Sequence, residues 1–433
     1  MKKKTLNELE ISEIEKIKQK QMQDIRDKEK DAREILNEVK KRGDEAIIEF
    51  TKKFDNVGLD KEDLVVKDQE IENAYQKVDE ETIEALNRAA ENIAIFQSNF
   101  LPDDLRISEF KKGIKLGYKV TSLNSVGCYV PGGKATYPSS ALMTAIPAKI
   151  AGVNQVNVTT PPSEDGSINP ATLVACDIAG VDIVYKIGGV QAIASLAYGT
   201  KSVDRVQKIV GPGGAYVSAA KNLVKKEVEI DMVAGPSEIT IIADETSEPK
   251  TVAMDLLAQA EHGPDSLSLL LTNSSELAKK ALEVVNKKLK NLNRRKLVKK
   301  SLDRSMIIEG EKRELFDLAN KIAPEHLEIM TKCPLEDLDY VQNAGAIFLG
   351  KNSPVAIGDY ATGCNHVLPT AGLAKTNSGL SVDDFLKKSS VQYMTKQGLS
   401  EIRDIGEKIA EIEDLISHRE SIKSRFWEEN QDE

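Results

Sequence analysis

Residues 181–196 read VDIVYKIGGVQAIASL. A short β-branched run, a turn with two glycines and an alanine-rich helical stretch follow one another in this segment. Parallel strands need a crossover helix between them, so this order is typical of a parallel α/β layer. The same texture recurs from about residue 115 onward, and the predicted strands are 155–159, 181–187, 206–210, 238–242, 266–271 and 346–349. We therefore predict an α/β fold.

The two ends of the chain differ from this central part. About the first hundred residues carry dense charge with helical apolar spacing, as in AREILNEV at 32–39. The tail from Leu399 onward places isoleucines at helical spacing, which predicts an amphipathic helical arm. The basic stretch 279–304 is interpreted as a solvated helix face because acidic segments surround it.

The composition excludes several classes of function. The chain has 433 residues, a formal net charge of −10 and only 5% aromatic residues. Such a chain is suited neither to neutralising phosphates nor to stacking on bases, so no nucleic-acid partner is expected. No stretch approaches the roughly 20 apolar residues of a membrane span and no signal segment is evident, so we expect a cytoplasmic protein without a membrane partner. The four cysteines are spread singly, which predicts free thiols.

Three glycine-rich turns, at 129–133, 187–191 and 210–215, each follow an apolar run and precede a helical stretch. Backbone N–H groups at such a helix start, unobstructed by side chains, suit a phosphate or pyrophosphate. None of the turns matches G-x-G-x-x-G, and a tight turn without a ligand explains each one alone. Three of them within one short stretch favour a nucleotide cofactor.

The first of only four histidines follows a helical stretch. Asp255, Gln259 and His262 recur at i, i+4 and i+7, which places them on one helix face, and a Gly-Pro pair ends the helix directly afterwards. A histidine there is commonly a cap on free carbonyls. The polar stripe on an otherwise apolar helix nevertheless indicates a buried polar partner.

The second and third histidines also have acidic neighbours. Glu325 adjoins His326 directly after Pro324, at an expected helix start, where a glutamate can be an ordinary cap or share base work with the histidine. The loop at 358–370 holds Asp359 and His366, and such loops often line sites.

The fourth histidine, His418, lies in the charged tail. Glu413 precedes it by five residues, about 140° around an ideal helix, so the two share a site only if the helix bends or ends between them. His418 alone would be interpreted as an exposed surface residue. Two imidazoles together with Asp359 and Gln259 would suit Zn²⁺, and Mn²⁺ would also accept these ligands.

Six strings in the chain together resemble the histidinol dehydrogenase family. They are VGCYVPGGK at 126–134, AGPSE at 234–238, QAEH at 259–262, APEHLE at 323–328, GDY at 358–360 and NHVLPT at 365–370. The resemblance extends from about residue 30 to about residue 425. In the tail, only Glu413 and His418 carry it.

The resemblance implies an NAD-dependent, zinc-requiring oxidation of L-histidinol to L-histidine through bound L-histidinaldehyde, the last step of histidine biosynthesis. It implies one Zn²⁺ per subunit, held by Gln259, His262, Asp359 and His418. The implied substrate contacts are Ser237, Gln259, His262, His326, Asp359, His366, Glu413 and His418. The implied NAD contacts are Tyr129, Gln191 and the position of Gly214, where the family normally has an asparagine.

The chemistry of this reaction gives the residues roles within the resemblance. An alcohol releases hydride as its hydroxyl proton leaves, and His326 is the expected base in both oxidations. Glu325 is expected to activate the water that hydrates the aldehyde. A thiohemiacetal at Cys128 or Cys364 is the alternative to hydration. The resemblance also implies a homodimer with shared active sites, in which His418 comes from the other subunit.

The resemblance further implies two Rossmann-like parallel α/β domains, similar to those of aldehyde dehydrogenases, with a helical N-terminal segment and a C-terminal helical arm. The expected divisions are 1–28 for the helical segment, 29–128 plus 238–380 for a large discontinuous domain, 129–237 for an inserted domain with the NAD-contacting loops, and 381–433 for the arm.

Two other functions remain open from the residues alone. A zinc hydrolase would use Glu325 to activate water on the metal but would leave the three glycine-rich turns without a role. A metal- or nucleotide-binding regulatory protein would leave the Glu325–His326 pair without a role. NADH formation from L-histidinol separates the three hypotheses.

Overall fold

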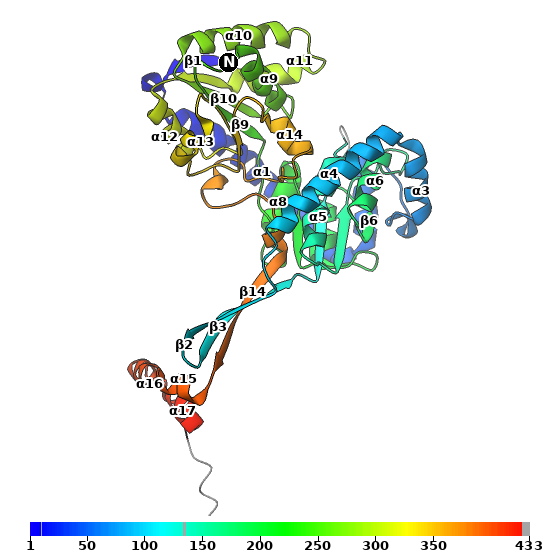
Figure 1. Ribbon diagram of the computed structural model, residues 1–433. Coiled ribbons are helices and arrows are strands. Elements are labelled where there is room, and N and C mark those ends of the chain that lie inside the picture. The colour runs from blue at the N-terminus through cyan, green and yellow to red at the C-terminus, as the bar shows by residue number, and fades with distance from the viewer. Residues whose placement is uncertain (10, 133–135, 427–433) are drawn as a thin grey trace, which may run out of the picture. The chain divides into compact units, whose positions relative to one another are not determined.

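The computed structural model describes residues 1–9, 11–132 and 136–426, and it divides into two compact units (Figure 1). The first unit comprises Met1–Phe100 and Leu123–Phe385, and the second comprises Leu101–Ser122 and Leu386–Glu433. In the described part of the chain, no helix has both the length and the apolar character that crossing a membrane requires.

The first unit contains a six-stranded parallel sheet in the order β1-β11-β10-β9-β12-β13. Apolar side chains of β9 alternate between its two faces, since Ile239 and Ile241 pack in one core and Ile242 in another. Both faces are therefore covered by helices, which explains the near-continuous apolar strands. The strands are β1 Lys2–Thr5, β9 Glu238–Ala243, β10 Leu267–Thr272, β11 Met306–Glu309, β12 His326–Met330 and β13 Ala346–Leu349, and the helices of this part are α9 Pro249–Ala260, α10 Ser275–Leu289, α11 Arg295–Arg304, α12 Lys312–Ile322, α13 Pro334–Asp337 and α14 Val355–Tyr360.

A second parallel sheet in the same unit has five strands in the order β6-β5-β4-β7-β8. Its strands are β4 Ser125–Tyr129, β5 Gln155–Thr159, β6 Ile183–Tyr185, β7 Lys208–Val210 and β8 Glu229–Ile230. The other helices of the unit are α1 Ile11–Arg42, α2 Asp44–Asp55, α3 Asp68–Lys77, α4 Glu80–Asn99, α5 Pro138–Ile150, α6 Pro170–Ile178, α7 Gly189–Tyr198 and α8 Ala215–Val224. The predicted α/β fold with parallel sheets is confirmed.

Helix α1 contributes to the cores of both sheets. Ile14, near its start, packs with residues of β9 and α12, whereas Ile25, Ala32 and Leu36 pack in the core that includes α7 and α8. One continuous 32-residue helix therefore links the two sheets of the first unit.

The second unit is a three-stranded antiparallel sheet followed by short helices. Strand β14 pairs with β3 over nine positions, from Leu386 opposite Ser122 to Met394 opposite Ile114, and β2 pairs with the other edge of β3. The elements are β2 Leu105–Lys111, β3 Ile114–Ser122, β14 Leu386–Met394, α15 Lys396–Ser400, α16 Arg403–Ile412 and α17 Ile416–Lys423.

Some elements differ from the expected divisions. The N-terminal segment, expected to be helical, begins with β1, which pairs with β11. Strand β4 contains the expected boundary between residues 128 and 129. The expected helical arm begins with the turn Val382–Phe385 and the strand β14, and residues 101–122 join this arm rather than the body of the chain because their hairpin supplies the partner of β14.

Candidate functional site

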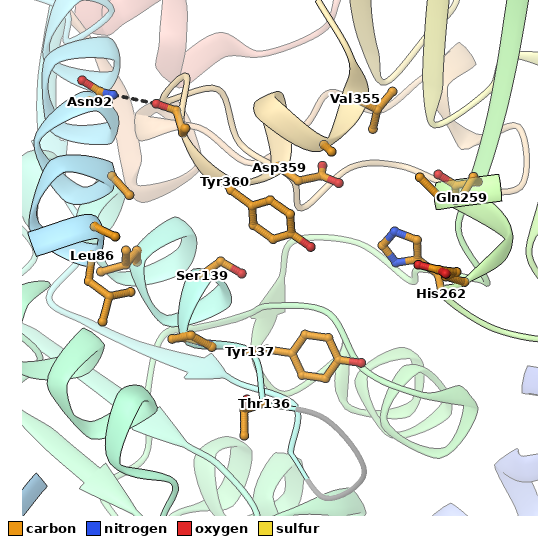
Figure 2. A pocket seen from close by; sticks show the side chains of 18 of the residues that line it. Leu86, Asn92, Thr136, Tyr137, Ser139, Gln259, His262, Val355, Asp359 and Tyr360 are labelled. Atoms are coloured by element: carbon orange, nitrogen blue, oxygen red, sulfur yellow. Dashed lines mark hydrogen bonds between the residues drawn. The ribbon is translucent and has the colours of Figure 1, made fainter. Parts of the chain in front are cut away.

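Three of the residues expected to bind a metal surround one cavity of the first unit. Figure 2 shows Gln259, His262 and Asp359 around this cavity, together with Tyr137 and Tyr360. Its volume is about 970 Å³. Helix α9 presents Gln259 in its last turn, His262 follows the end of the helix, and α14 presents Asp359. The stripe on α9 therefore lines the same cavity as the carboxylate of Asp359.

The protonation states of these side chains suit a divalent cation. Burial lowers the pKa of His262, which favours the neutral imidazole that binds metals. Burial alone would raise the pKa of Asp359, but the side chain of His326, whose Nε2 atom lies 3.6 Å from Oδ1, and the imidazoles of His366 and His262 hold it below its usual value. Gln259 is buried and its Nε2 atom has no hydrogen-bond partner. The donors are thus a neutral nitrogen, a carboxylate and an amide.

The first unit alone does not complete a metal site. Across residues 1–9, 11–132 and 136–426, no three His, Cys, Asp or Glu side chains gather in a group that could hold a metal ion. The fourth expected ligand, His418, lies on α17 of the second unit, with Glu413 just before that helix. Helix α16 ends at Ile412 and Asp414 has a positive φ of 57°, so no continuous helix joins Glu413 to His418.

The Glu325–His326 pair is almost fully buried, with 5% and 3% of the two residues exposed. The Nδ1 atom of His326 lies 3.1 Å from the backbone oxygen of Glu238, and the backbone N–H of Glu238 donates to Oε2 of Glu325 at 2.8 Å. A carbonyl oxygen only accepts, so Nδ1 keeps a hydrogen, and Nε2 is the nitrogen that can release or accept a proton. That Nε2 atom lies 3.6 Å from Oδ1 of Asp359.

The environment shifts the pKa of both members of the pair upward. Burial raises the pKa of Glu325 to about 7, which makes it a carboxyl group that titrates near neutrality. Burial works to lower the pKa of His326, but the carboxylates of Glu325 and Asp359 outweigh it and raise the pKa to about 9. Without a metal or substrate, His326 is therefore mostly an imidazolium near neutrality, and it acts as a base only after Nε2 has released its proton.

The expected helix start at Glu325 is wrong. Helix α12 ends at Ile322, Ala323 adopts a left-handed conformation with φ 49°, and His326 begins the buried strand β12. The left-handed residue redirects the chain into the sheet, where His326 pairs with Ile239 of β9 and Ala346 of β13. The dyad thus sits at the amino end of a central strand.

A neighbouring cavity of about 380 Å³ brings most of the expected site residues together. His366 lies within it, with Nε2 3.3 Å from the Ser140 hydroxyl and Nδ1 3.0 Å from the backbone oxygen of Asp359. Burial lowers the pKa of His366. The cavity is lined by Ser237, His262, Glu325, His326, Asp359 and His366, and also by Pro131, Pro212, Gly213 and Gly214 from the glycine-rich turns.

The glycine-rich turns follow the carboxyl ends of β4, β6 and β7 and are held in place by polar contacts. The backbone N–H of Gly189 donates to the Tyr129 hydroxyl at 3.1 Å. Gly211, with φ 111°, donates its N–H to Asp231 at 2.8 Å and accepts from Lys221 at 2.8 Å. Of the first turn, Gly133 lies outside the described residues, as does the neighbouring Lys134.

A third cavity, of about 640 Å³, adjoins the turn at Gly189. Gln191 lines it, and neither of the two amide atoms of Gln191 has a hydrogen-bond partner although the residue is 1% exposed. The aromatic rings of Phe54 and Tyr216 line the same cavity. Unpaired buried amides are costly, which indicates a polar ligand for this side chain.

The four cysteines are free, as predicted. Cys128 is fully buried, and burial raises the pKa of its thiol to about 12. Such a thiol is not ionised near neutrality and is a poor nucleophile. Cys364 is exposed and lines neither of the two site cavities.

Two contact residues were not predicted from the sequence. Glu238 holds both members of the dyad through its backbone atoms, and Ser140 contacts His366. Glu238 occurs in the quoted string AGPSE, but its backbone role leaves no mark in the residue type. Ser140 lies at the start of α5, where a serine is unremarkable.

Comparisons with known proteins give one consistent family. A family model described as histidinol dehydrogenase matches residues 18–426. A histidinol dehydrogenase of Methanocaldococcus jannaschii is 48% identical over 426 residues and covers 98% of both chains. One of Methanococcus maripaludis is 50% identical over 393 residues, 91% of this chain and 92% of its own. The crystal structure of histidinol dehydrogenase from Elizabethkingia anophelis matches with a TM-score of 0.89 and 38% identity, over 91% of each chain.

Proposed function

The chain belongs to the histidinol dehydrogenase family, and from that membership we propose that it oxidises L-histidinol to L-histidine with NAD as hydride acceptor and a zinc ion in the site. The observation that carries the proposal is the 380 Å³ cavity, because the buried Glu325–His326 dyad and the glycine-rich turn at Gly213 open onto it together. Neither a hydrolase nor a regulatory protein needs both features.

Gln259, His262 and Asp359 would hold the metal, with His418 as the fourth protein ligand. The neutral imidazole of His262, the carboxylate of Asp359 and the amide oxygen of Gln259 fit Zn²⁺. When bound, the ion would orient the substrate through its amine and imidazole nitrogens and polarise its oxygen. Ser237, His326, His366 and Glu413 would complete the substrate contacts.

Tyr129, Gln191 and the turn at Gly214 would bind NAD. The unpaired Gln191 amide faces a cavity of about 640 Å³, and the rings of Phe54 and Tyr216 offer apolar surfaces for a flat heterocycle. When bound, NAD would accept one hydride in each of the two oxidations. Gly214 offers its backbone N–H where the family normally has an asparagine side chain.

In the first oxidation, Nε2 of His326 accepts the hydroxyl proton as the substrate carbon releases hydride. The contact of Nδ1 with the Glu238 carbonyl fixes the tautomer that leaves Nε2 free. The developing imidazolium is stabilised by the nearby carboxylates of Glu325 and Asp359. The alcohol loses one hydride and one proton, which leaves the aldehyde.

In the second oxidation, Glu325 accepts a proton from water as the water oxygen adds to the aldehyde carbon, and the imidazolium of His326 returns its proton to the aldehyde oxygen, so that a hydrate forms and His326 is again a base. A carboxyl group with a pKa of about 7 is half ionised near neutrality and therefore suits this step. His326 then accepts the hydroxyl proton of the hydrate while the second hydride leaves, and the carboxylic acid remains. The high pKa of the Cys128 thiol argues against a thiohemiacetal at that residue, and Cys364 lines neither site cavity.

A second copy of the chain would supply Glu413 and His418 to each site. The helices that carry these residues expose several large apolar side chains, with exposures of 53% for Ile405, 51% for Ile409, 73% for Ile412 and 62% for Ile416. Exposed large apolar side chains on two packed helices are typical of a protein interface. The proposed assembly is a homodimer with shared active sites.

The test of this function is the formation of NADH on mixing the protein with L-histidinol, NAD and Zn²⁺. The proposal predicts NADH and L-histidine as products and a loss of activity on chelation. A zinc hydrolase would form no NADH, and a regulatory protein would bind ligands without turnover. Either result would contradict the proposal.

A further inference from the structure

A buried ion pair includes Glu238, the residue whose backbone contacts both members of the Glu325–His326 dyad. Nζ of Lys18, on α1, lies 3.3 Å from Oε1 of Glu238, the first residue of β9. Only 11% of the lysine side chain and 2% of the glutamate side chain are exposed. Lys18 lines neither cavity of the site but a separate one of about 330 Å³. The lysine therefore contacts no substrate.

The backbone of Glu238 holds both members of the dyad. Its N–H donates to Oε2 of Glu325 at 2.8 Å, and its carbonyl oxygen lies 3.1 Å from Nδ1 of His326. A displacement of this one residue would therefore change the position of the carboxylate and the tautomer of the imidazole together. Because Lys18 forms an ion pair with the side chain of Glu238, it restrains the position of the Glu238 backbone.

Lys18 also contacts the segment that leads into the dyad. Its Nζ atom donates to the backbone oxygen of Ile322, the last residue of α12. Ala323, with its left-handed φ of 49°, and Pro324 are the only residues between that helix and Glu325. One ammonium group thus ties the start of β9 to the end of α12, and these two segments place the dyad.

A contribution to the stability of the fold does not by itself explain why a buried ion pair is present at this position. Removing two charges from water is costly, and a buried ion pair is often no more stabilising than apolar side chains of the same size. A pair of this kind contributes mainly a defined geometry. Here the geometry is that of the two groups proposed to move protons.

We propose that Lys18, paired with Glu238, is a positioning residue for both oxidation steps. This inference rests on the proposed roles of Glu325 and His326. Lys18 holds the Glu238 backbone so that Nε2 of His326 and the Glu325 carboxylate meet the substrate in reactive alignment. Misplacement of reacting groups by about 1 Å can cost about 100-fold in rate.

The test compares Lys18→Met, Glu238→Gln, the double variant and Lys18→Arg in the full-length, zinc-loaded protein. Lys18→Met and Glu238→Gln are each expected to lower kcat by about 10- to 100-fold, for L-histidinol and for L-histidinaldehyde. The KM for L-histidinol and the zinc content should stay at the wild-type values because Gln259, His262 and Asp359 are untouched. The double variant should be no slower than either single one, because the pair acts as a unit. Lys18→Arg should retain most of kcat.

Lys208→Met is the matched control. Lys208 is also buried, pairs with Asp384 at 3.0 Å and joins a strand to a distant segment. It differs from Lys18 because it lies at the amino end of β7, opposite the end that leads into the glycine-rich turn at 210–215. The Lys208→Met substitution should lower the melting temperature of the protein without lowering kcat per zinc-loaded site. A wild-type kcat in Lys18→Met or in the double variant would overturn the inference, as would an equal fall of kcat in the control.

Glu325→Gln and His326→Asn, measured alongside, separate this inference from its premise. If these two variants lose activity and Lys18→Met keeps it, the positioning role is wrong and the dyad assignment stands. If His326→Asn stays active, the dyad assignment is wrong, and the inference is overturned with it.

Discussion

The Nδ1 atom of His326 lies 3.1 Å from the backbone oxygen of Glu238, and this contact leaves Nε2 as the free nitrogen that can accept a proton. His326→Asn keeps a donor near the Nδ1 position but removes the base. It is expected to lower kcat for both oxidations by about 100- to 10,000-fold. Steady-state rates with L-histidinol and with L-histidinaldehyde check this, and a near wild-type rate with either substrate would argue against one base for both steps.

Gly214→Asn should strengthen NAD binding. Gly214 is the residue before α8, its φ of −67° is allowed for any residue, and a Cβ atom there would meet nothing within 4 Å. An added amide can hydrogen-bond the cofactor, which is worth up to about tenfold in affinity, and it can also cap the helix. Titration with NAD measures the change in Kd.

Gly58→Asn is the control for that substitution, since a Cβ atom at Gly58 also meets open space. It lies outside the turns that adjoin the cavities and should leave the NAD affinity unchanged. An unaltered Kd for NAD in Gly214→Asn would contradict this prediction, because it would show that an asparagine at this position adds no contact with the cofactor.

Glu328→Gln should flatten the pH dependence of stability in the metal-free protein. Burial, and then the charge of Asp255, raise the pKa of Glu328 from 4.5 to about 8. Between these values the folded state holds a proton that the unfolded state has released. The free energy of unfolding therefore falls with rising pH, by up to about 1.4 kcal/mol per unit.

The glutamine variant does not lose this unfolding free energy as the pH rises. The difference in unfolding free energy between the variant and the wild type should therefore be constant below pH 4.5 and should grow in favour of the variant until about pH 8. Urea denaturation at several pH values measures the two curves. The exposed Glu62→Gln serves as control and should follow the wild type. Parallel curves for Glu328→Gln and the wild type would contradict the assigned shift.

A mixture of two inactive variants tests the shared site. His262→Ala and His418→Ala should each abolish activity, because each removes one proposed metal ligand. Co-refolded together, they should recover about a quarter of the wild-type activity, since half of the dimers are mixed and each mixed dimer has one intact site of two. Refolding each variant alone is the control, and the absence of recovery would mean that His418 serves its own chain.

The parallel strands were largely predictable from local composition. The β-branched run at 155–159 matches β5, which is buried over residues 156–159, and the apolar run at 346–349 matches β13, a partly exposed strand at the edge of its sheet. Strand β1 was missed, since its sequence KKKT has no apolar pattern and lysines suit an exposed edge strand.

The dyad was located correctly in sequence but placed on the wrong element. Glu325 and His326 after Pro324 fit a helix start by local rules, whereas β12 buries His326 and Glu328 on one strand. Such a strand is stable only because distant groups hydrogen-bond with its polar side chains: the backbone oxygen of Glu238 accepts from His326, and the N–H of Val355 donates to Glu328. Tertiary contacts of this kind cannot be deduced from a window of sequence.

The contacts of Glu238 and Lys18 near the dyad show a second limit of prediction from the sequence. Glu238 acts through backbone atoms that every residue carries, and Lys18 lies 220 residues away on a charged helix among many lysines. Only the fold brings them together. By contrast, Gln259, His262 and Asp359 could be singled out because scarce or mismatched polar residues on apolar elements indicate a site.

The number of NADH molecules formed per L-histidinol in Glu325→Gln tests most directly the division of labour between the two dyad residues. Glutamine keeps the hydrogen bond from Glu238 N–H but cannot take a proton from water. Quenched-flow measurements should give two NADH per L-histidinol for the wild type and about one for the variant, with L-histidinaldehyde remaining and the first hydride transfer slowed far less than the hydration step. Two NADH at the wild-type rate in Glu325→Gln would contradict the account.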